Sequence, residues 1–444
     1  MISSFKDKIF SYWNHNFIRN VATLQVGDFA GNITQALVAV LLARMLQPEL
    51  YGIYILAFGL AGLIGGFLNI NSSGAALTLL GGHYIRRNRE DIKSVMTSFV
   101  KISVIVSFIL FVGMIVSPFV SKNLYGNYTV GFLASILILG SIISNFFYSY
   151  SMVALQVIGE IKKMTIVGLL NQLFKSLFSV IFVFIGLGVW GAISGHFIGS
   201  IIIFAITFFI WKRIVRSENI FPSIREILGN FRKVKMRDFL KFSIWISLDK
   251  NLSNLFNILP IVITGIFVAT SEITFFKLAF AYINLAVSFI GAIGTLLNVE
   301  FPKIKAGDNP EKLKRNFTKI SLYSLGITTL LTAGALIVAP LAFRIFYGEN
   351  FIPSIKYVFA LFVYGSIMGL GVGLGPMWRA INKVKISIMI NLISLSIGVL
   401  LGFYLISDYG VWGTVIMITF WYSFSHIVSF VYLRRELSGM IISK

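Results

Sequence analysis

The chain has 444 residues, of which 57% are hydrophobic and only 12% are charged. Because a soluble domain carries about 25% charged residues, this composition excludes a soluble enzyme whose core alone shelters the apolar side chains. The chain has no Cys, which excludes disulfide bonds and thiolate metal sites, and its formal net charge is +21.

Apolar stretches of about 20 residues or more follow one another along the chain, and each is long enough to cross a bilayer as a helix. Residues 1–20 lack the apolar core and cleavage site of a signal peptide, so they are interpreted as a lead-in to the first span. The pattern predicts an all-α polytopic membrane protein with about twelve transmembrane helices, at 21–46, 52–80, 95–118, 130–155, 165–187, 191–211, 242–269, 275–300, 320–343, 357–378, 387–406 and 412–432.

The Lys and Arg residues between the predicted spans lie almost entirely on one side. Connections on the side of the N-terminus hold thirty of the 38, whereas the other side holds only Lys122, Arg344 and Lys356. By the positive-inside rule, both termini are predicted to be cytoplasmic. Topology and anionic membrane lipid account for the basic charge, so no nucleic-acid partner is expected.

The longest hydrophilic stretch, 212–241, carries nine Lys and Arg residues interleaved with apolar ones such as Phe221 and Ile227. This interleaving is typical of an amphipathic helix on the cytoplasmic membrane surface. We interpret the stretch as a basic linker between an N-terminal six-helix bundle at 1–211 and a C-terminal bundle at 242–444. A regulatory docking role is the weaker alternative.

Short motifs recur at about half the chain length, which indicates a duplication. An even number of spans in each half keeps its orientation, so we expect two parallel six-helix repeats with a central cavity between the halves, as in transporters that alternate access. The matched segments are Gly188–Gly191 with Gly410–Gly413, Ile158–Lys162 with Ile381–Lys385, and Glu49 with Glu272, at shifts of 222 or 223.

Two corresponding spans carry polar stripes with the same spacing of three, four and three. A stripe of this kind lies on one face of a helix, and polar groups at mid-membrane normally face the bundle interior or a wet cavity. Hydrogen bonding that only holds helices together is the alternative. The stripes are Gln25, Asp28, Asn32 and Gln35 in the first span, and Ser247, Lys250, Asn254 and Asn257 in the seventh.

Asp28 and Lys250 occupy corresponding positions and carry opposite charges, so they are candidates for a gate closed by a salt bridge. Asp249 adjoins Lys250 and is a candidate to neutralise it. Together with Lys250, two further cations within spans would make the cavity cationic. These are Lys175, which shares a face with Asn171 and Ser179, and Lys277, which shares a face with Asn284 and Ser288.

Other in-span groups have simpler interpretations. Lys101 lies at the start of the third span, where a long side chain reaches the interface. His196 and His426 are isolated, and a lone intramembrane His more often serves helix packing than proton transfer or ligand binding. The sequence has no P-loop, His-rich cluster or paired carboxylates, so no catalytic residue, metal or cofactor is predicted.

Several segments resemble the multidrug/oligosaccharidyl-lipid/polysaccharide exporter superfamily, and within it the bacterial polysaccharide-unit flippases of the Wzx (O-antigen) type. The resemblance covers nearly the whole chain, but its motifs are degenerate. The residues that carry it are Leu41–Tyr54 (LLARMLQPELYGIY), Leu77–Arg89, the turn Gly159–Lys163, and the two Gly-Val-Trp-Gly segments.

The resemblance implies a transporter of the bacterial inner membrane rather than an enzyme. Its cargo would be an undecaprenyl-pyrophosphate-linked oligosaccharide, moved from the cytoplasmic to the outer leaflet for O-antigen or lipopolysaccharide synthesis. A polysaccharide polymerase and chain-length proteins are the further partners it suggests. A cavity with cations and many amides suits an anionic, hydroxyl-rich cargo.

Three alternatives stay open. A cation-coupled multidrug exporter of the same superfamily would need net acidic groups in its cavity, whereas the spans here hold more Lys than Asp. A peptidoglycan-precursor flippase often has helices beyond twelve. A membrane-integrated glycan enzyme would need a large loop or an acidic motif, and the sequence shows neither.

Overall fold

The computed structural model describes residues 16–68 and 72–442, and every element within these ranges is a helix. At some helix positions only the backbone is described. The side chains of Asp28, Asp249 and Lys250 lie outside the described part, so the gate inferred from them stays a prediction.

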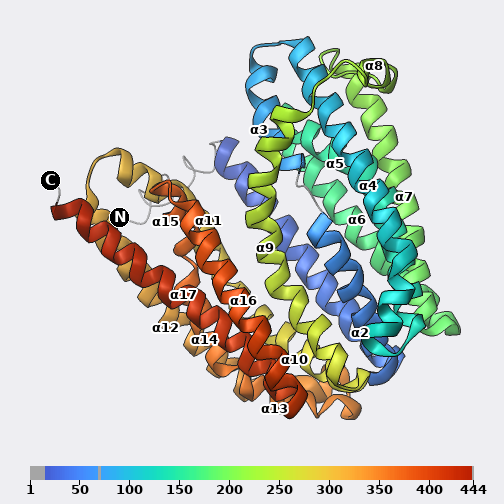
Figure 1. The fold of residues 1–444 in the computed structure, drawn as a ribbon, viewed down its shortest axis with the longest axis vertical. Coiled ribbons are helices and arrows are strands. Elements are labelled where there is room, and N and C mark those ends of the chain that lie inside the picture. Colours follow the sequence, from blue (N-terminus) through green and yellow to red (C-terminus); the bar gives the residue numbers. More distant parts are fainter. Residues whose placement is uncertain (1–15, 69–71, 443–444) are drawn as a thin grey trace, which may run out of the picture. The chain divides into compact units, whose positions relative to one another are not determined.

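The first compact unit comprises the chain up to Leu46 together with Leu60–Asn251 (Figure 1). It contains most of α2 (Asn16–Leu68) and the beginning of α9 (Arg237–Phe267). The helices between them are α3 (Ser72–Ile85), α4 (Arg89–Tyr125), α5 (Tyr128–Ile158), α6 (Ile161–Phe182), the π-helical turn η1 (Val183–Leu187), α7 (Gly188–Ser217) and α8 (Ile224–Asn230).

The second compact unit comprises Gln47–Gly59 and Leu252–Lys444. After the end of α9 it contains α10 (Thr270–Ser288), α11 (Gly291–Ala306), α12 (Pro310–Ala342), η2 (Phe343–Tyr347), η3 (Glu349–Phe351), α13 (Ser354–Ala360), α14 (Phe362–Gly371), α15 (Leu374–Ala380), α16 (Val384–Tyr409) and α17 (Val411–Ile442).

The described helices account for the predicted spans. Seven segments are long and apolar enough to cross a membrane, and two of them, Thr23–Gly66 and Ile161–Ser217, have room for two crossings and break at Gln47 and Gly186. Two further crossings are bent helix pairs, and Asn251–Phe267 is a shorter apolar helix. The prediction of an all-helical polytopic membrane protein with about twelve helices is confirmed.

The compact units differ from the predicted bundles 1–211 and 242–444 at two places. Gln47–Gly59 belongs with the second unit, and α9 belongs with the first as far as Asn251. The α2 helix breaks where Gln47 has φ 62° and Pro48 lacks a backbone N–H. Beyond this break, the Thr274 hydroxyl donates to the Pro48 carbonyl at 2.6 Å, which holds the segment in the second unit.

Left-handed turn residues repeat between the two halves of the chain and support the predicted duplication. Four pairs of residues with positive φ are separated by 221 to 223 positions, and these pairs are Arg87 with Asp308, Gly126 with Gly348, Gly159 with Asn382, and Gly188 with Gly410. The residues after the first pair, Asn88 and Asn309, both cap a helix by accepting from the backbone N–H three residues on. Corresponding chain positions therefore adopt corresponding backbone conformations.

The helix pair α6–α7 in the first unit packs through glycines on α7. A Cβ added to Gly195 would lie 2.3 Å from the Phe178 backbone, and one added to Gly199 would lie 2.5 Å from the Lys175 Cα. Small residues that let backbones approach are typical of membrane helix packing. This close approach fixes the backbone of α6 around Lys175.

The corresponding pair in the second unit, α16–α17, packs through glycines on the other partner. A Cβ added to Gly398 would lie 2.7 Å from the Trp421 ring, and one added to Gly402 would lie 2.1 Å from the Met417 sulfur. At these two positions the small residues lie on α16 and the large ones on α17, the reverse of α6–α7. Gly413 on α17 still approaches the Leu405 backbone, as its counterpart Gly191 on α7 approaches the Phe182 backbone.

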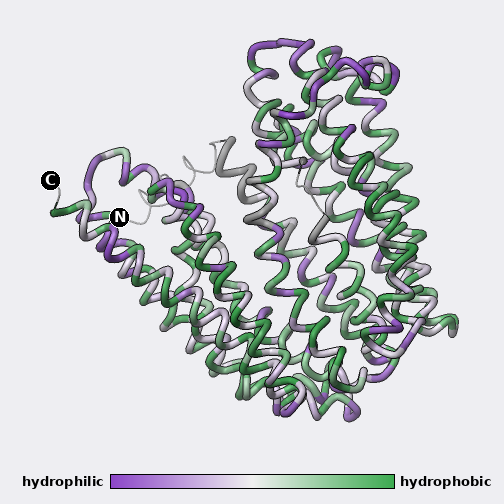
Figure 2. The backbone as a smooth tube through the Cα atoms, viewed as in Figure 1, coloured by the Kyte–Doolittle hydropathy of each residue, from purple (hydrophilic) through white to green (hydrophobic). Residues whose placement is uncertain are grey.

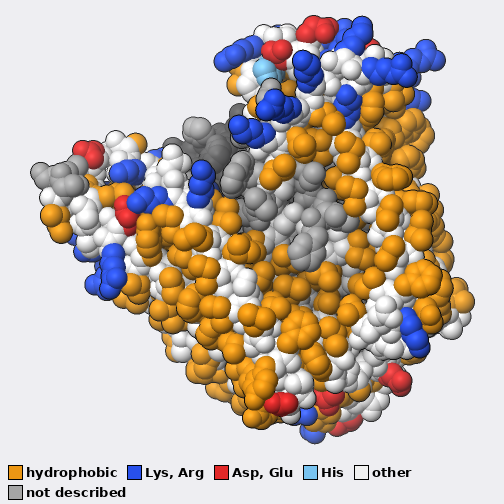
Figure 3. All heavy atoms as spheres, viewed as in Figure 1, with side chains coloured by type: hydrophobic (Ala, Val, Ile, Leu, Met, Phe, Trp, Pro, Cys, Tyr) orange, Lys and Arg blue, Asp and Glu red, His pale blue; other side chains and the backbone are white. Residues whose placement is uncertain are grey.

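Apolar side chains cover the sides of each unit, and charged ones gather at the helix ends (Figures 2 and 3). Phe108 and Leu330 are 68% and 74% exposed in the middle of α4 and α12, as expected for helices that face lipid. We call the end with α8 and the turns at Arg87 and Gly159 the basic end of the first unit. The basic end of the second unit has the turns at Asp308 and Asn382.

Candidate functional sites within the membrane spans

Lys175 lies in a polar cluster of the first unit that three helices build. Its ammonium on α6 donates to the Ser144 hydroxyl of α5 at 3.4 Å. The His196 ring on α7 lies close enough to interact electrostatically with the same ammonium. Ser144 is 1% exposed. The described hydrogen-bond partner of the ammonium is thus a neutral hydroxyl, and His196 lies beside the cluster on α7.

Two amide side chains flank this cluster on the preceding turn of α6. Asn171 interacts with the Tyr148 hydroxyl, yet its Oδ1 is buried without a hydrogen bond, and so is the Oε1 of Gln172. The Gln172 oxygen lies over Gly31 of α2, where an added Cβ would come within 2.3 Å of it. Sequence reasoning selected Asn171 but missed Gln172, because the stripe spacing did not include it.

The predicted α2 stripe is exposed. Gln25, Asn32 and Gln35 are open to the surface, whereas the adjacent face of α2, with Gly27 and Gly31, packs against α6. The Gln25, Asn32 and Gln35 side chains therefore do not form the packed face of this helix. An exposed amide within a membrane span requires water or a polar ligand, because lipid cannot hydrogen-bond it.

The corresponding stripe on α9 has two parts. Ser247 is buried and donates to the Ser243 carbonyl at 2.6 Å, so it is satisfied within its own helix. Asn254 and Asn257 are exposed, and Asn257 reaches back to the Ser253 carbonyl at 3.4 Å. The two halves thus share exposed amides at corresponding places.

Lys277 lies on α10 of the second unit, two turns from its beginning. Its ammonium is 5.9 Å from the centre of the Phe280 ring, a cation–π distance. Asn284, expected on the same face, instead accepts a hydrogen bond from the buried Tyr364 hydroxyl at 2.7 Å. That amide is therefore committed to packing between α10 and α14.

Neither Lys175 nor Lys277 has an acidic partner among the described residues. Among the described residues, no carboxylate lies within ion-pair distance of Lys175 or Lys277. Both side chains are half-buried, and a charged group within a membrane span is costly and is normally paired or functional. Each unit therefore presents a cation that an anionic group could bind.

His426 packs between helices of the second unit, as the sequence predicted for a lone intramembrane His. Its Nδ1 lies 3.3 Å from the Ile367 carbonyl, and its ring lies over Gly371, where a Cβ would come within 2.6 Å. The close approach requires glycine at position 371.

Gln47–Tyr54, part of the Leu41–Tyr54 segment that carries the family resemblance, packs within the second unit. Asn350 donates to the Gln47 side chain at 2.7 Å, and Gly52 lies so close to the Thr270 carbonyl that a Cβ would come within 2.0 Å of it. The Tyr357 hydroxyl donates to Glu272 in the same region. Glutamine, proline and glycine in this motif thus have a structural role that sequence reasoning did not identify.

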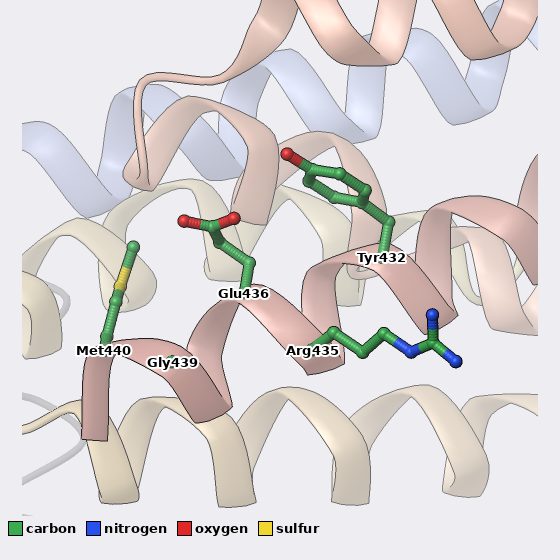
Figure 4. Close-up of a pocket in the computed structure, with 5 residues that line it drawn as sticks. All are labelled: Tyr432, Arg435, Glu436, Gly439 and Met440. Atoms are coloured by element: carbon green, nitrogen blue, oxygen red, sulfur yellow. The ribbon is translucent and has the colours of Figure 1, made fainter. Parts of the chain in front are cut away.

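A shallow hollow of the second unit lies at the basic end of α17 (Figure 4). Tyr432 and Glu436 point to the same side of the helix, while Arg435 points away. Glu436 forms an ion pair with Lys383 at 2.6 Å, and this partner raises the pKa of Lys383. The hollow contains none of the predicted site residues. Within 16–68 and 72–442, no group of three His, Cys, Asp or Glu side chains could hold a metal ion.

Solved membrane transporters share this fold. A multidrug resistance MATE family transporter of the MOP superfamily, in an inward-facing conformation, superimposes with a TM-score of 0.75 at 16% identity, over 96% of this chain and 99% of that one. The lipid II flippase MurJ matches with a TM-score of 0.68 at 18% identity, over 94% and 87%.

A third structure is a MOP superfamily transporter from Pyrococcus furiosus, described with a binding pocket of reverse polarity that suggests a different function. It matches with a TM-score of 0.59 at 17% identity, over 95% of this chain and 93% of that one. No curated protein matches the sequence. A family model described as "Polysaccharide biosynthesis protein" matches residues 41–356, so the chain belongs to this family and has the fold of MOP superfamily transporters.

Proposed function

We propose that the protein is a flippase that moves a lipid-linked oligosaccharide repeat unit, carried on undecaprenyl pyrophosphate, across the bacterial inner membrane by alternating access. The cargo would be a unit of O-antigen or a related surface polysaccharide. Membership of a polysaccharide biosynthesis family supports the cargo class, and a transporter fold supports the movement. A lipid II flippase among its structural neighbours supports a flippase activity.

The observation that carries this proposal is the pair of in-span lysines without acidic partners, Lys175 and Lys277. A pyrophosphate carries about two negative charges or more at neutral pH and binds best to ammonium groups in a site of reduced dielectric. Exposed amides supply the hydrogen bonds that sugar hydroxyls need. These amides are Gln25, Asn32, Gln35, Asn254 and Asn257.

The proposed roles are assigned by chemistry. Lys175 and Lys250 in the first unit and Lys277 in the second are each proposed to bind pyrophosphate, and Asn171 acts beside Lys175. Asp28 and Lys250 form the proposed gate, with Asp249 next to it. The polysaccharide polymerase and chain-length proteins would act on the cargo after release. The basic ends would face the cytoplasm, together with both termini.

The orientation of the protein in the membrane can be tested by labelling single introduced cysteines, because the chain has no Cys of its own. In intact cells, Asn123→Cys near the end of α4 should react with an impermeant maleimide, whereas Gly229→Cys on α8 should not. Both positions are exposed. Labelling of Gly229→Cys from outside would reverse the orientation.

The function is tested with the purified chain in sealed vesicles that contain a fluorescent undecaprenyl-pyrophosphate-linked oligosaccharide. We expect protein-dependent flipping of this lipid and no transport of a cationic dye. A multidrug exporter, the second candidate, is favoured by the MATE neighbour and by Asp28 and Asp249 in the spans. It would give the opposite result, dye transport without flipping.

A further inference from the structure

The linker after α7 is folded onto the first unit. Phe221 and Ile227 are 1% and 4% exposed and belong to the apolar core of that unit. Ser223 caps α8 in a capping box with Glu226, and Arg89 of α4 forms an ion pair with Glu226 at 2.7 Å. A continuous amphipathic helix on the membrane surface is therefore not what the described linker forms.

The turn that follows α8 is fixed at a defined depth. Lys101 of α4 donates to the Val234 carbonyl at 2.9 Å, and its ammonium lies 5.3 Å from the centre of the Phe231 ring. Residues 102–120, which follow Lys101 on α4, have no charged side chain. At 1.5 Å per residue this run measures about 28 Å, close to the thickness of a hydrocarbon core. Lys101 therefore marks one edge of that core.

We call residues 231–236 the linker turn. Arg232, Lys233 and Lys235 are exposed there, and within the described part of the chain none of them forms an ion pair. The nearby linker carboxylates are already engaged, Glu226 by Arg89 and Glu218 by the Tyr84 hydroxyl. The Asp238 side chain lies outside the described part.

We infer that the linker turn is a binding surface for the headgroups of anionic phospholipids in the leaflet at the basic end. Three cations within four residues lie at the depth where phosphate groups begin, and lipid phosphates are the counter-charge available there. Charge complementarity and depth both favour lipid over a soluble partner. The surface would anchor the first unit through α8 and the linker, independently of the cargo.

The test uses the full chain with Gly229→Cys, labelled with bimane and placed in phosphatidylcholine bilayers. Gly229 is exposed, and an added Cβ there meets no atom within 4 Å. Bimane should be quenched more strongly by headgroup-spin-labelled phosphatidylglycerol than by the phosphatidylcholine analogue. We call the difference between these two values the excess quenching. In the background Arg232→Gln with Lys233→Gln, the excess quenching should fall roughly tenfold.

The matched control is Lys122→Gln, which removes an exposed cation near the other end of α4. Lys122 lies 21 residues after Lys101, or about 32 Å along α4, which is several times the Debye length of about 8 Å, so the excess quenching should persist. If the double linker variant does not insert, Lys235→Gln alone should still lower the excess several-fold.

Equal quenching by the two lipids in the unmodified background would overturn the assignment, and so would quenching by neither. Loss of the excess on adding 10 mM inorganic phosphate would reassign the surface to free phosphate. Loss on adding RNA, with no effect of the glutamine variants on lipid quenching, would reassign it to nucleic acid. Persistence of the excess under both additions supports the lipid surface.

Discussion

The helix pairs α6–α7 and α16–α17 come from corresponding places in the two repeats and share one glycine contact, Gly191 and Gly413, yet their other close contacts use glycines on opposite partners. In the first unit Lys175 lies against Gly199. At a shift of 223 its counterpart in the second unit is Gly398, which lies against Trp421. A duplicated scaffold has thus kept close helix packing while reversing the side-chain sizes, and only one repeat carries a cation at this position.

The two repeats share backbone conformations but differ in where they carry charged side chains. Eight of the ten positive-φ residues in the described part pair between the repeats, whereas Lys175 and Lys277 lie at positions that do not correspond. Gly199 leaves room for the α6 backbone and lets the Lys175 side chain reach Ser144 on α5. The proposed cargo, with a charged group at one end and sugars at the other, would suit such differently placed cations on a duplicated scaffold.

The largest effect on stability is expected when the α6–α7 interface is overfilled. Gly199→Leu would place a side chain where a Cβ alone already lies 2.5 Å from the Lys175 Cα, so the helices must separate. We expect a loss of about 3 kcal/mol or more, measured by thermal unfolding in detergent. Gly326→Leu on α12, where an added Cβ meets no atom within 4 Å, is the control and should change the midpoint little.

The reversed interface predicts a rescue. Gly398→Leu alone should destabilise by about 1–3 kcal/mol, because all three near contacts of its Cβ belong to Trp421. Adding Trp421→Ala removes the obstacle, so the double variant should be at least about 1 kcal/mol more stable than the two separate losses predict. A double-mutant cycle measures this coupling, and strict additivity would show that the obstacle is not Trp421.

Serine hydroxyls bridge both pairs in the same way and should give matched, smaller effects. Ser179 donates to the Ala192 carbonyl and Ser394 to the Trp421 carbonyl, each at 2.6 Å. Replacing either by Ala should cost about 0.5–1.5 kcal/mol, and the two losses should add because the residues lie in different units. Unequal losses would show that the two interfaces differ in more than side-chain size.

The features that could be predicted from the sequence are those that depend on a local pattern of residues. The spans follow from apolar runs, and the turns at Gly159, Gly188 and their counterparts follow from repeated motifs. The exchange of Gln47–Gly59 into the second unit could not be predicted, because it depends on a contact with Thr274 more than two hundred residues away. The hydrogen bond from Lys101 to the Val234 carbonyl could not be predicted for the same reason, so the sequence indicates only an interfacial anchor at Lys101.

The candidate site residues likewise fall into those that a local pattern predicts and those that only helix packing brings together. Gln25, Asn32, Gln35, Asn254 and Asn257 lie exposed within spans, where a polar stripe is expected to meet water or ligand. Ser144, Gln172 and Tyr148 were missed because each joins the Lys175 cluster from another helix or another face. Only packing between helices brings those side chains together.

The smallest effect concerns α8, which only the first unit has among the described elements. The Ser223 backbone N–H donates to the Glu226 carboxylate and, with Arg89 nearby, lowers the pKa of Glu226. The stability that Glu226 contributes is present above its ordinary pKa of about 4.3 and is lost as pH falls through the lower, folded value. Bimane on Gly229→Cys should therefore change its emission at low pH.

In the Glu226→Gln background that acid transition should be absent, because the remaining group does not titrate. Asp408→Gln, which removes an exposed carboxylate near the end of α16, is the control and should keep the transition. An acid transition of unchanged amplitude in Glu226→Gln would show that other groups hold α8 in place.

The central claim is that in-span cations bind the anionic group of the cargo. The most direct measurement is flipping of a fluorescent lipid-linked oligosaccharide in vesicles by Lys175→Gln with Lys277→Gln. We predict a fall of roughly a hundredfold or more, since two charge-assisted contacts are lost. The matched Lys→Arg pair should keep most activity, and Lys122→Gln with Lys356→Gln should keep all of it. Flipping at the unmodified rate by the double Lys175 and Lys277 glutamine variant would contradict the account.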